Sequence, residues 1–88
     1  MRIDLIATSV TMTEDQLRYQ IGLRLKEART DAEFNRAQLA LLTGLSEERI
    51  EQWERGAAEM YLDELDVLCE ALDVDPEFVL GWDRVQLH

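Results

Sequence analysis

The sequence predicts an all-α domain of five helices, preceded by a short arm or strand. Helix-capping residues recur along the chain, and apolar residues follow them at spacings of three and four. Proline and glycine are scarce, with one and four copies in 88 residues. That length accommodates one domain with one modest core. We expect an arm at residues 1–12, the domain at 13–82 and a tail at 83–88.

The first helix is predicted to follow the arm. Residues 1–12 alternate apolar and polar side chains, such as Ile3 and Leu5, which favours a short strand or a frayed terminus. Thr13 and Gln16 have the spacing of a capping box, so a helix should begin there and extend to about Arg29. The residues predicted to form its buried stripe are Leu17, Ile21, Leu25 and Ala28.

Residues 35–56, NRAQLALLTGLSEERIEQWERG, predict two short helices joined by a tight turn. Asn35 caps the first helix, and Gly44 ends it because glycine adopts the left-handed conformation at little cost. Ser46 caps the second helix and Gly56 ends it. Two short capped helices joined in this way form a helix-turn-helix unit.

Two more helices are expected after Gly56. Asp75 and Pro76 should begin the last helix and Gly81 should end it. Val79 and Leu80 would then complete the core. Cys69 is predicted to be a small core residue, and as the single cysteine it cannot form an intramolecular disulfide. The core face of the fourth helix is predicted to contain Leu62, Leu65, Leu68, Cys69 and Leu72.

The chain is acidic, with 19 acidic and 9 basic residues and a net charge of −10. Residues 1–44 carry no net charge, because six basic residues balance six acidic ones, so the whole excess lies in residues 45–88. DNA-binding proteins usually present a basic face. The net charge therefore argues against DNA binding. The acidic residues responsible for it lie in the second half of the chain.

The chain resembles the phage repressor and Cro type of DNA-binding domain, the XRE family. The matching segments are IGLRLKEAR at 21–29, NRAQLA followed by TG, LSEERIEQWERG, and LCEALDV at 68–74. They lie at the family's spacing and span roughly residues 17–82. The resemblance implies a compact lambda-repressor-like domain whose third helix enters the major groove of DNA.

The resemblance also implies roles for individual residues. Arg29 should form a structural ion pair with Glu54. An aromatic residue of the last helix should contact a second copy, which here points to Phe78 and Trp82, although a monomer could bury Trp82 in its own core. The base-facing positions are Glu47, Glu48, Arg49 and Gln52; the positions near DNA phosphates are Asn35, Arg36, Arg55 and Lys26.

The sequence thus predicts a cytoplasmic transcriptional regulator of the repressor type that binds operator DNA as a homodimer. An alternative is an acidic module that docks on a basic protein partner or imitates nucleic acid. We expect no enzyme, cofactor or metal site, because the one histidine, His88, is terminal and no glycine-rich phosphate loop is present. No signal peptide is recognisable, and no apolar run is long enough for a membrane span.

Overall fold

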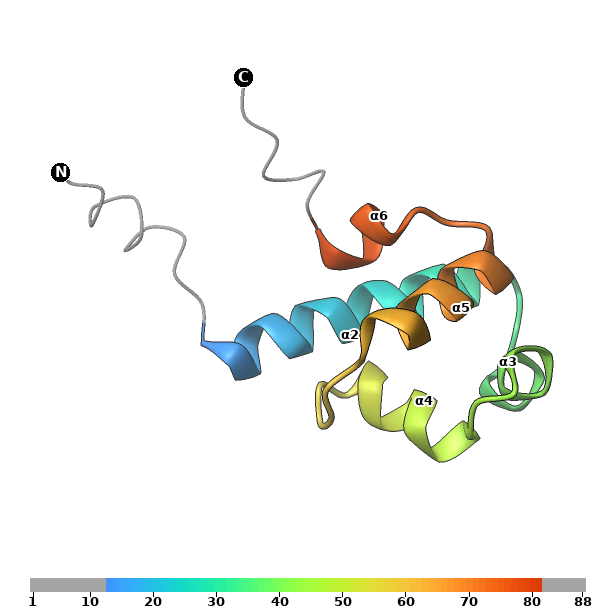
Figure 1. Ribbon diagram of the computed structural model, residues 1–88, viewed down its shortest axis with the longest axis horizontal. Helices are drawn as coiled ribbons and strands as arrows, with labels where there is room; N and C mark the ends of the chain where they lie inside the picture. The colour runs from blue at the N-terminus through green and yellow to red at the C-terminus, as the bar shows by residue number, and fades with distance from the viewer. Residues whose placement is uncertain (1–12, 82–88) are drawn as a thin grey trace, which may run out of the picture.

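The computed structural model describes residues 13–81, so the expected arm and tail, and also Trp82, lie outside the described residues. Within this range the chain forms five helices and no strand, which confirms the predicted fold class. The helices, labelled as in Figure 1, are α2 (Glu14–Asp31), α3 (Arg36–Thr43), α4 (Glu47–Glu54), α5 (Leu62–Leu72) and α6 (Pro76–Leu80).

The starts of the first three helices follow the capping chemistry expected from the sequence. Thr13 and Gln16 exchange two hydrogen bonds of 3.0 Å between side chain and backbone. Asn35 and Gln38 form the same reciprocal pair at 2.7 and 2.8 Å. The Ser46 hydroxyl accepts a 3.0 Å hydrogen bond from a backbone amide in the first turn of α4. Each of these contacts satisfies an amide that has no partner within its helix.

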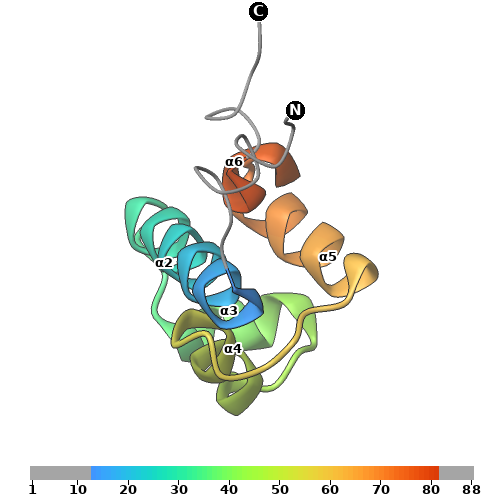
Figure 2. The ribbon, with the colours of Figure 1, turned by 90° about the vertical axis from the view of Figure 1, so that its left-hand side faces the viewer.

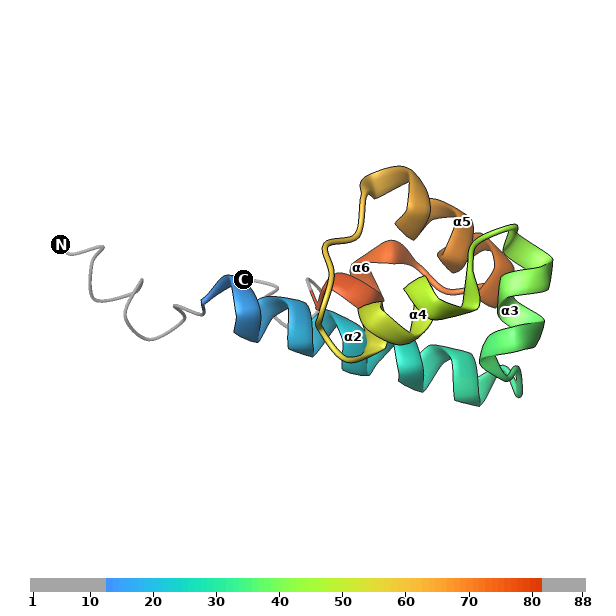
Figure 3. The same ribbon diagram turned by 90° about the horizontal axis from the view of Figure 1, so that it is seen from below.

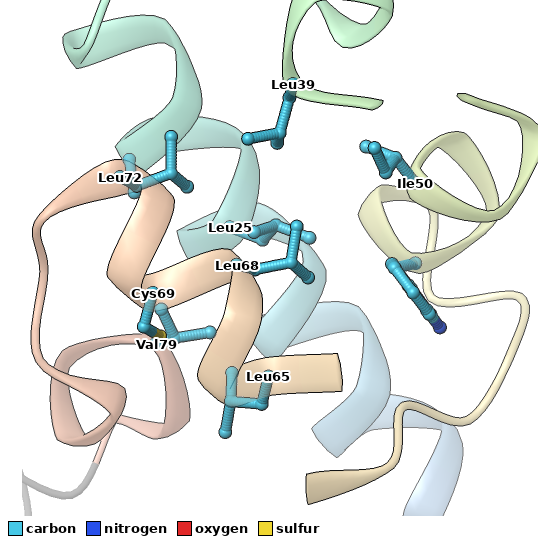
Figure 4. Close-up of a cluster of buried hydrophobic side chains, with 10 residues drawn as sticks. Leu25, Leu39, Ile50, Leu65, Leu68, Cys69, Leu72 and Val79 are labelled. Carbon is cyan, nitrogen blue, oxygen red and sulfur yellow. The ribbon is translucent and has the colours of Figure 1, made fainter. Parts of the chain in front are cut away.

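The core lies where all five helices meet. Helix α2 packs against α4 and α6, and α3 packs against α4 and α5. Viewed from the end, α2, α4, α5 and α6 lie around a common centre (Figure 2). Each helix contributes one residue with no exposed surface to this centre (Figure 4). In chain order these residues are Leu25, Leu39, Ile50, Leu68 and Val79.

Two local predictions were wrong. Leu17 is 45% exposed and Leu62 is 76% exposed, although both were expected in the core. The first turns of α2 extend past the other helices (Figure 3), and both leucines line an open, mostly apolar hollow of about 400 Å³ between these turns and the start of α5. Asp75 precedes α6 as expected, but its side chain makes no capping hydrogen bond. No helix in residues 13–81 is long and apolar enough to cross a bilayer.

At Gly22, α2 lies directly against the backbone at the end of α4. A Cβ atom placed on Gly22 would lie 2.7 Å from the carbonyl oxygen of Glu54, and nearer still to that of Trp53. Real Cβ atoms do not tolerate such contacts with backbone, so any other residue would push α4 away from α2. Gly44 differs, because it ends α3 with a φ of 79° and has open space around the position of a Cβ.

We predict that Gly22→Ala lowers the free energy of unfolding by about 2–3 kcal/mol, because overpacking outweighs the gain in helix propensity of about 1 kcal/mol. Gly44→Ala is the matched control and should lose about 1–2 kcal/mol from its left-handed backbone alone. Urea denaturation followed by circular dichroism measures both. Equal losses in the two variants would contradict the close approach at Gly22.

Cys69 is buried at 3% exposure, as predicted, within the cluster shown in Figure 4. Burial, together with the negative charges of Asp66 and Asp75, raises the pKa of its thiol from 9.0 to about 11. The folded chain therefore holds the thiol proton more tightly than the unfolded chain does.

We expect the raised thiol pKa to make the folded state less stable as pH rises from 9 towards 11, and to give no pH dependence well below pH 9. The measurement is the free energy of unfolding between pH 8 and pH 10.5 for the wild type and for Cys69→Ala. The alanine variant should start lower because of its cavity and decline less steeply. Parallel curves would show that Cys69 does not titrate differently on folding.

Candidate nucleic-acid interface

Helix α4, the second helix of the helix-turn-helix unit, has one buried side and one accessible side. The four residues expected to face DNA bases are all at least partly accessible: Glu47 and Glu48 are exposed, and Arg49 and Gln52 are half-buried. Arg55, just after the helix, is exposed as well. The buried side consists of Ile50, Trp53 and Glu54. The helix thus anchors itself through one face and presents a mainly acidic face to solvent.

The anchor at the end of α4 is a buried carboxylate with two arginine partners. The Glu54 side chain is 1% exposed. Arg29 of α2 donates to its two oxygens from Nε at 2.6 Å and from Nη2 at 3.1 Å. The remaining Nη1 of Arg29 donates to the Phe34 carbonyl at 2.8 Å, which also fixes the connection between α2 and α3. The ion pair implied by the family resemblance is therefore present as a bidentate contact.

Arg36, expected near a phosphate, is the second partner of this carboxylate. Its Nε donates to Glu54 Oε1 at 3.0 Å, and its side chain is 34% exposed. Asn35, also expected near a phosphate, is exposed, but its Oδ1 accepts the 2.7 Å capping hydrogen bond from the amide of Gln38. Both side chains at the start of α3 therefore have internal structural contacts.

Arg49 differs from the other residues expected to face bases. Its Nη2 lies 3.1 Å from both carboxylate oxygens of Glu64 in α5. The guanidinium carbon lies 4.8 Å from the centre of the Trp53 ring, which is a cation–π distance. In this structure Arg49 is thus folded against the domain, while the base-facing roles of Arg49, Glu47, Glu48 and Gln52 stay predictions.

The two remaining phosphate candidates are the more accessible cations. Arg55 has a side chain that is 62% exposed and pairs loosely with Glu51, at 3.6 Å from Nε to Oε2. Lys26 is exposed on α2. Within residues 13–81, neither Lys26 nor Arg24 lies within 4 Å of a carboxylate, whereas each of the other basic residues does. Five of the seven basic residues at positions 13–81 therefore have a carboxylate partner within the domain.

The expected dimer contact can be placed only in part. Phe78 is half-buried on α6 and packs beside the core, while Trp82 is outside the described residues. In the described part of the chain no group of three or more histidine, cysteine, aspartate or glutamate side chains is arranged to hold a metal ion.

Comparison with known proteins shows which family this helix-turn-helix domain belongs to. The model of the Cro/C1-type helix-turn-helix DNA-binding domain matches residues 24–83. The chain belongs to this family. Because it is a family of DNA-binding transcription regulators, the protein is a helix-turn-helix transcription regulator, which agrees with the expectation that it is not an enzyme.

Solved structures have the same fold as this Cro/C1-type domain. The restriction-modification controller protein C.AhdI from Aeromonas hydrophila is 32% identical, with a TM-score of 0.68 over 70% of this chain and 94% of that chain. The clp gene regulator ClgR from C. glutamicum is 26% identical, with a TM-score of 0.72 over 82% and 92%. An HTH_3 family transcriptional regulator from Vibrio cholerae is 25% identical, with a TM-score of 0.73 over 81% of this chain and 40% of its own length. No curated protein sequence gives a significant match.

Sequence reasoning missed two contacts of this Cro/C1-type domain. Arg36 reaches a carboxylate 18 positions away, and Arg49 reaches one 15 positions away. The acidic excess could have indicated these contacts. On a chain with about twice as many acidic as basic residues, an arginine side chain usually has a carboxylate within reach. Which carboxylate each arginine meets depends on helix packing, which is not visible in local sequence.

We predict that Arg29→Ala lowers the free energy of unfolding by about 3–5 kcal/mol, because it removes the bidentate partner of a buried carboxylate. Arg36→Ala should cost about 1 kcal/mol, since its pair with Glu54 is partly exposed to solvent. Urea denaturation monitored by far-ultraviolet circular dichroism compares the two variants. Similar losses would show that the two arginines share the carboxylate equally.

Proposed function

We propose that the protein is a dimeric transcriptional repressor, acting in the cytoplasm, that binds a two-fold symmetric operator through α4. The observation that carries the proposal is the fixed presentation of Glu47, Glu48 and Gln52 on the accessible side of a helix anchored at both ends. Ser46 caps its start, and the Glu54 ion pairs hold its end against α2. A helix that is held in a fixed position and fits the major groove suits base recognition.

The residue types on this face suit direct recognition of bases. A glutamine side chain can form two hydrogen bonds with adenine, and a glutamate can accept a hydrogen bond from the amino group of cytosine. Lys26 and Arg55 are the accessible cations for phosphate contacts. Because a monomer offers so few phosphate contacts, a second copy is needed for firm binding, and we propose Phe78 and Trp82 as its contact residues. A bound dimer would repress by excluding polymerase or a competing regulator.

The alternative function, docking on a basic protein surface or imitation of nucleic acid, is favoured by one observation. Glu47, Glu48 and Glu51 contribute three carboxylates to the accessible side of α4, and in this structure Arg49 is drawn away from them. Affinity for duplex DNA depends largely on neutralising phosphates, which this face does weakly. The two functions make opposite predictions about salt and partner, so one experiment separates them.

The deciding experiment is selection from a randomised duplex pool at low salt and then at about 0.15 M salt. Enrichment of a symmetric site that persists at the higher salt is the result expected for a dimeric operator-binding protein. Loss of all enrichment at about 0.15 M salt, where surface charges are screened beyond roughly 8 Å, would reject operator binding and favour a basic protein partner.

For the selected site, we predict that Gln52→Ala relaxes the preference at one base pair per half-site, at a cost of about 1–3 kcal/mol. Gln20→Ala on α2, outside the helix-turn-helix unit, is the matched control and should retain the full preference. Competition binding with single-base variants of the site measures both. An unchanged preference in Gln52→Ala would exclude this residue from base recognition.

A further inference from the structure

The contact between Arg49 and Glu64 withdraws a positive charge from the proposed DNA-binding face. Arg49 occupies the third position of α4, in the same turn as Glu47 and Glu48. Residues three and four apart lie on neighbouring parts of a helix surface, so Arg49 borders both the accessible Gln52 and the buried Trp53. Its side chain can therefore extend either outwards or against the core, and in this structure it lies against the core.

The groups that hold Arg49 are themselves fixed by other contacts. Glu64 Oε1 accepts a 2.9 Å hydrogen bond from the amide of Tyr61, which closes the first turn of α5. The Trp53 indole Nε1 donates to the Glu59 carbonyl at 3.0 Å, and the same carbonyl lies 3.5 Å from Arg49 Nη2. A carboxylate, a carbonyl and an aromatic ring thus form a site for the guanidinium without needing Arg49 for their own placement.

The exposed fractions indicate that this contact competes with solvent and ligand. The side chain of Arg49 is 37% exposed and that of Glu64 is 17% exposed. A guanidinium at this exposure is not locked in the core as Arg29 is, at 8%. An incoming phosphate, or the acceptor atoms O6 and N7 of guanine, would have to displace a carboxylate that is already in place.

We propose that Glu64 is an affinity- and specificity-determining residue, because it holds Arg49 against Trp53 and away from DNA. This inference rests on the proposed function of α4 as the base-contacting helix. Glu64 lies outside the helix-turn-helix unit and acts through Arg49, so it is a positioning residue. With Arg49 held back, recognition depends on glutamate and glutamine side chains; with Arg49 released, α4 gains a cation suited to guanine or to a phosphate.

Glu64→Gln is the decisive variant, because glutamine can keep an oxygen acceptor for the Tyr61 amide while it removes the negative charge and one of the two oxygens that hold Arg49. We expect Glu64→Gln to bind DNA roughly tenfold more tightly than the wild type at low salt, which is the gain typical of one modest arginine contact. The slope of log affinity against log salt should steepen by about 0.9, for one additional phosphate contact. A gain limited to sites with a new guanine would assign the contact to a base, and an equal gain on all duplexes would assign it to a phosphate.

Three further variants separate release of Arg49 from the simple loss of a negative charge. Asp63→Asn removes the neighbouring exposed carboxylate and keeps the oxygen that accepts from the Glu64 amide, so it should change affinity less than twofold. Arg49→Met should leave the affinity within about twofold of wild type, because Arg49 is already withheld. The double variant Arg49→Met with Glu64→Gln has the wild-type net charge and should lose the whole gain.

Each contrary result overturns the inference. A tenfold gain in Asp63→Asn would attribute the effect to net charge. A loss of affinity in Arg49→Met, with a shallower salt slope, would show that Arg49 already contacts DNA in the wild type. A gain that survives in the double variant would show that Arg49 is not the residue released.

A measurement without DNA separates failure of this inference from failure of the proposed function. The indole proton resonance of Trp53 in the free protein should shift in Glu64→Gln, because the guanidinium leaves the ring face, and should stay in place in Asp63→Asn. If the Trp53 resonance does not shift in Glu64→Gln, then Glu64 does not hold Arg49 against the ring, whatever the protein binds. If the wild type selects no operator, the proposed function fails; the inference then stands only if Glu64→Gln still gains affinity for a mixed-sequence duplex.

Discussion

The pairing of the buried Glu54 carboxylate with Arg29 and Arg36 is the interaction on which the rest of the structure depends. A charge at 1% exposure is costly unless it is paired and hydrogen-bonded, and here three donor nitrogens from two arginines satisfy it. Arg29 comes from α2 and Arg36 from α3, while Glu54 ends α4. One carboxylate therefore joins three helices at a single point. Because breaking it leaves unpaired charge in the interior, the relative placement of these helices is strongly specified.

The close approach at Gly22 works together with this ion-pair centre. Glu54 contributes its side chain to the arginines and its carbonyl oxygen to the contact surface that Gly22 leaves open. The backbone of α4 can lie against α2 only where no side chain intervenes, and it is held there by the bidentate pair with Arg29. The position and rotation of α4 relative to α2 are thus fixed, and with them the direction that its accessible side faces. A recognition helix benefits from such rigidity, because the helix itself need not be brought into position at the moment of binding.

Local chemistry made much of this fold predictable. Thr13, Asn35 and Ser46 correctly predicted the starts of three helices, and Gly44 and Gly81 predicted the ends of two. These predictions succeed because capping and left-handed turns depend on a few adjacent residues. Leu17 and Leu62 could not be placed in the same way. Helical periodicity shows which residues share a face, but only tertiary packing decides whether another helix covers that face. Asp73 ends α5 with a φ of 58° where no glycine marks the position.

The candidate site was less predictable than the fold, for a physical reason that the arginines illustrate. A long charged side chain reaches several ångströms in many directions, and its final contact depends on which carboxylates the packing brings near it. Arg36 and Arg49 were both expected to meet DNA, yet the domain supplies each with a carboxylate of its own. Their internal pairing leaves few accessible cations for phosphates. Because nonspecific binding to DNA is almost entirely electrostatic, such a face binds random sequence weakly. For the operator binding that we propose, affinity would then come mainly from contacts with bases and from a second copy, so the acidic composition would favour selectivity over strength.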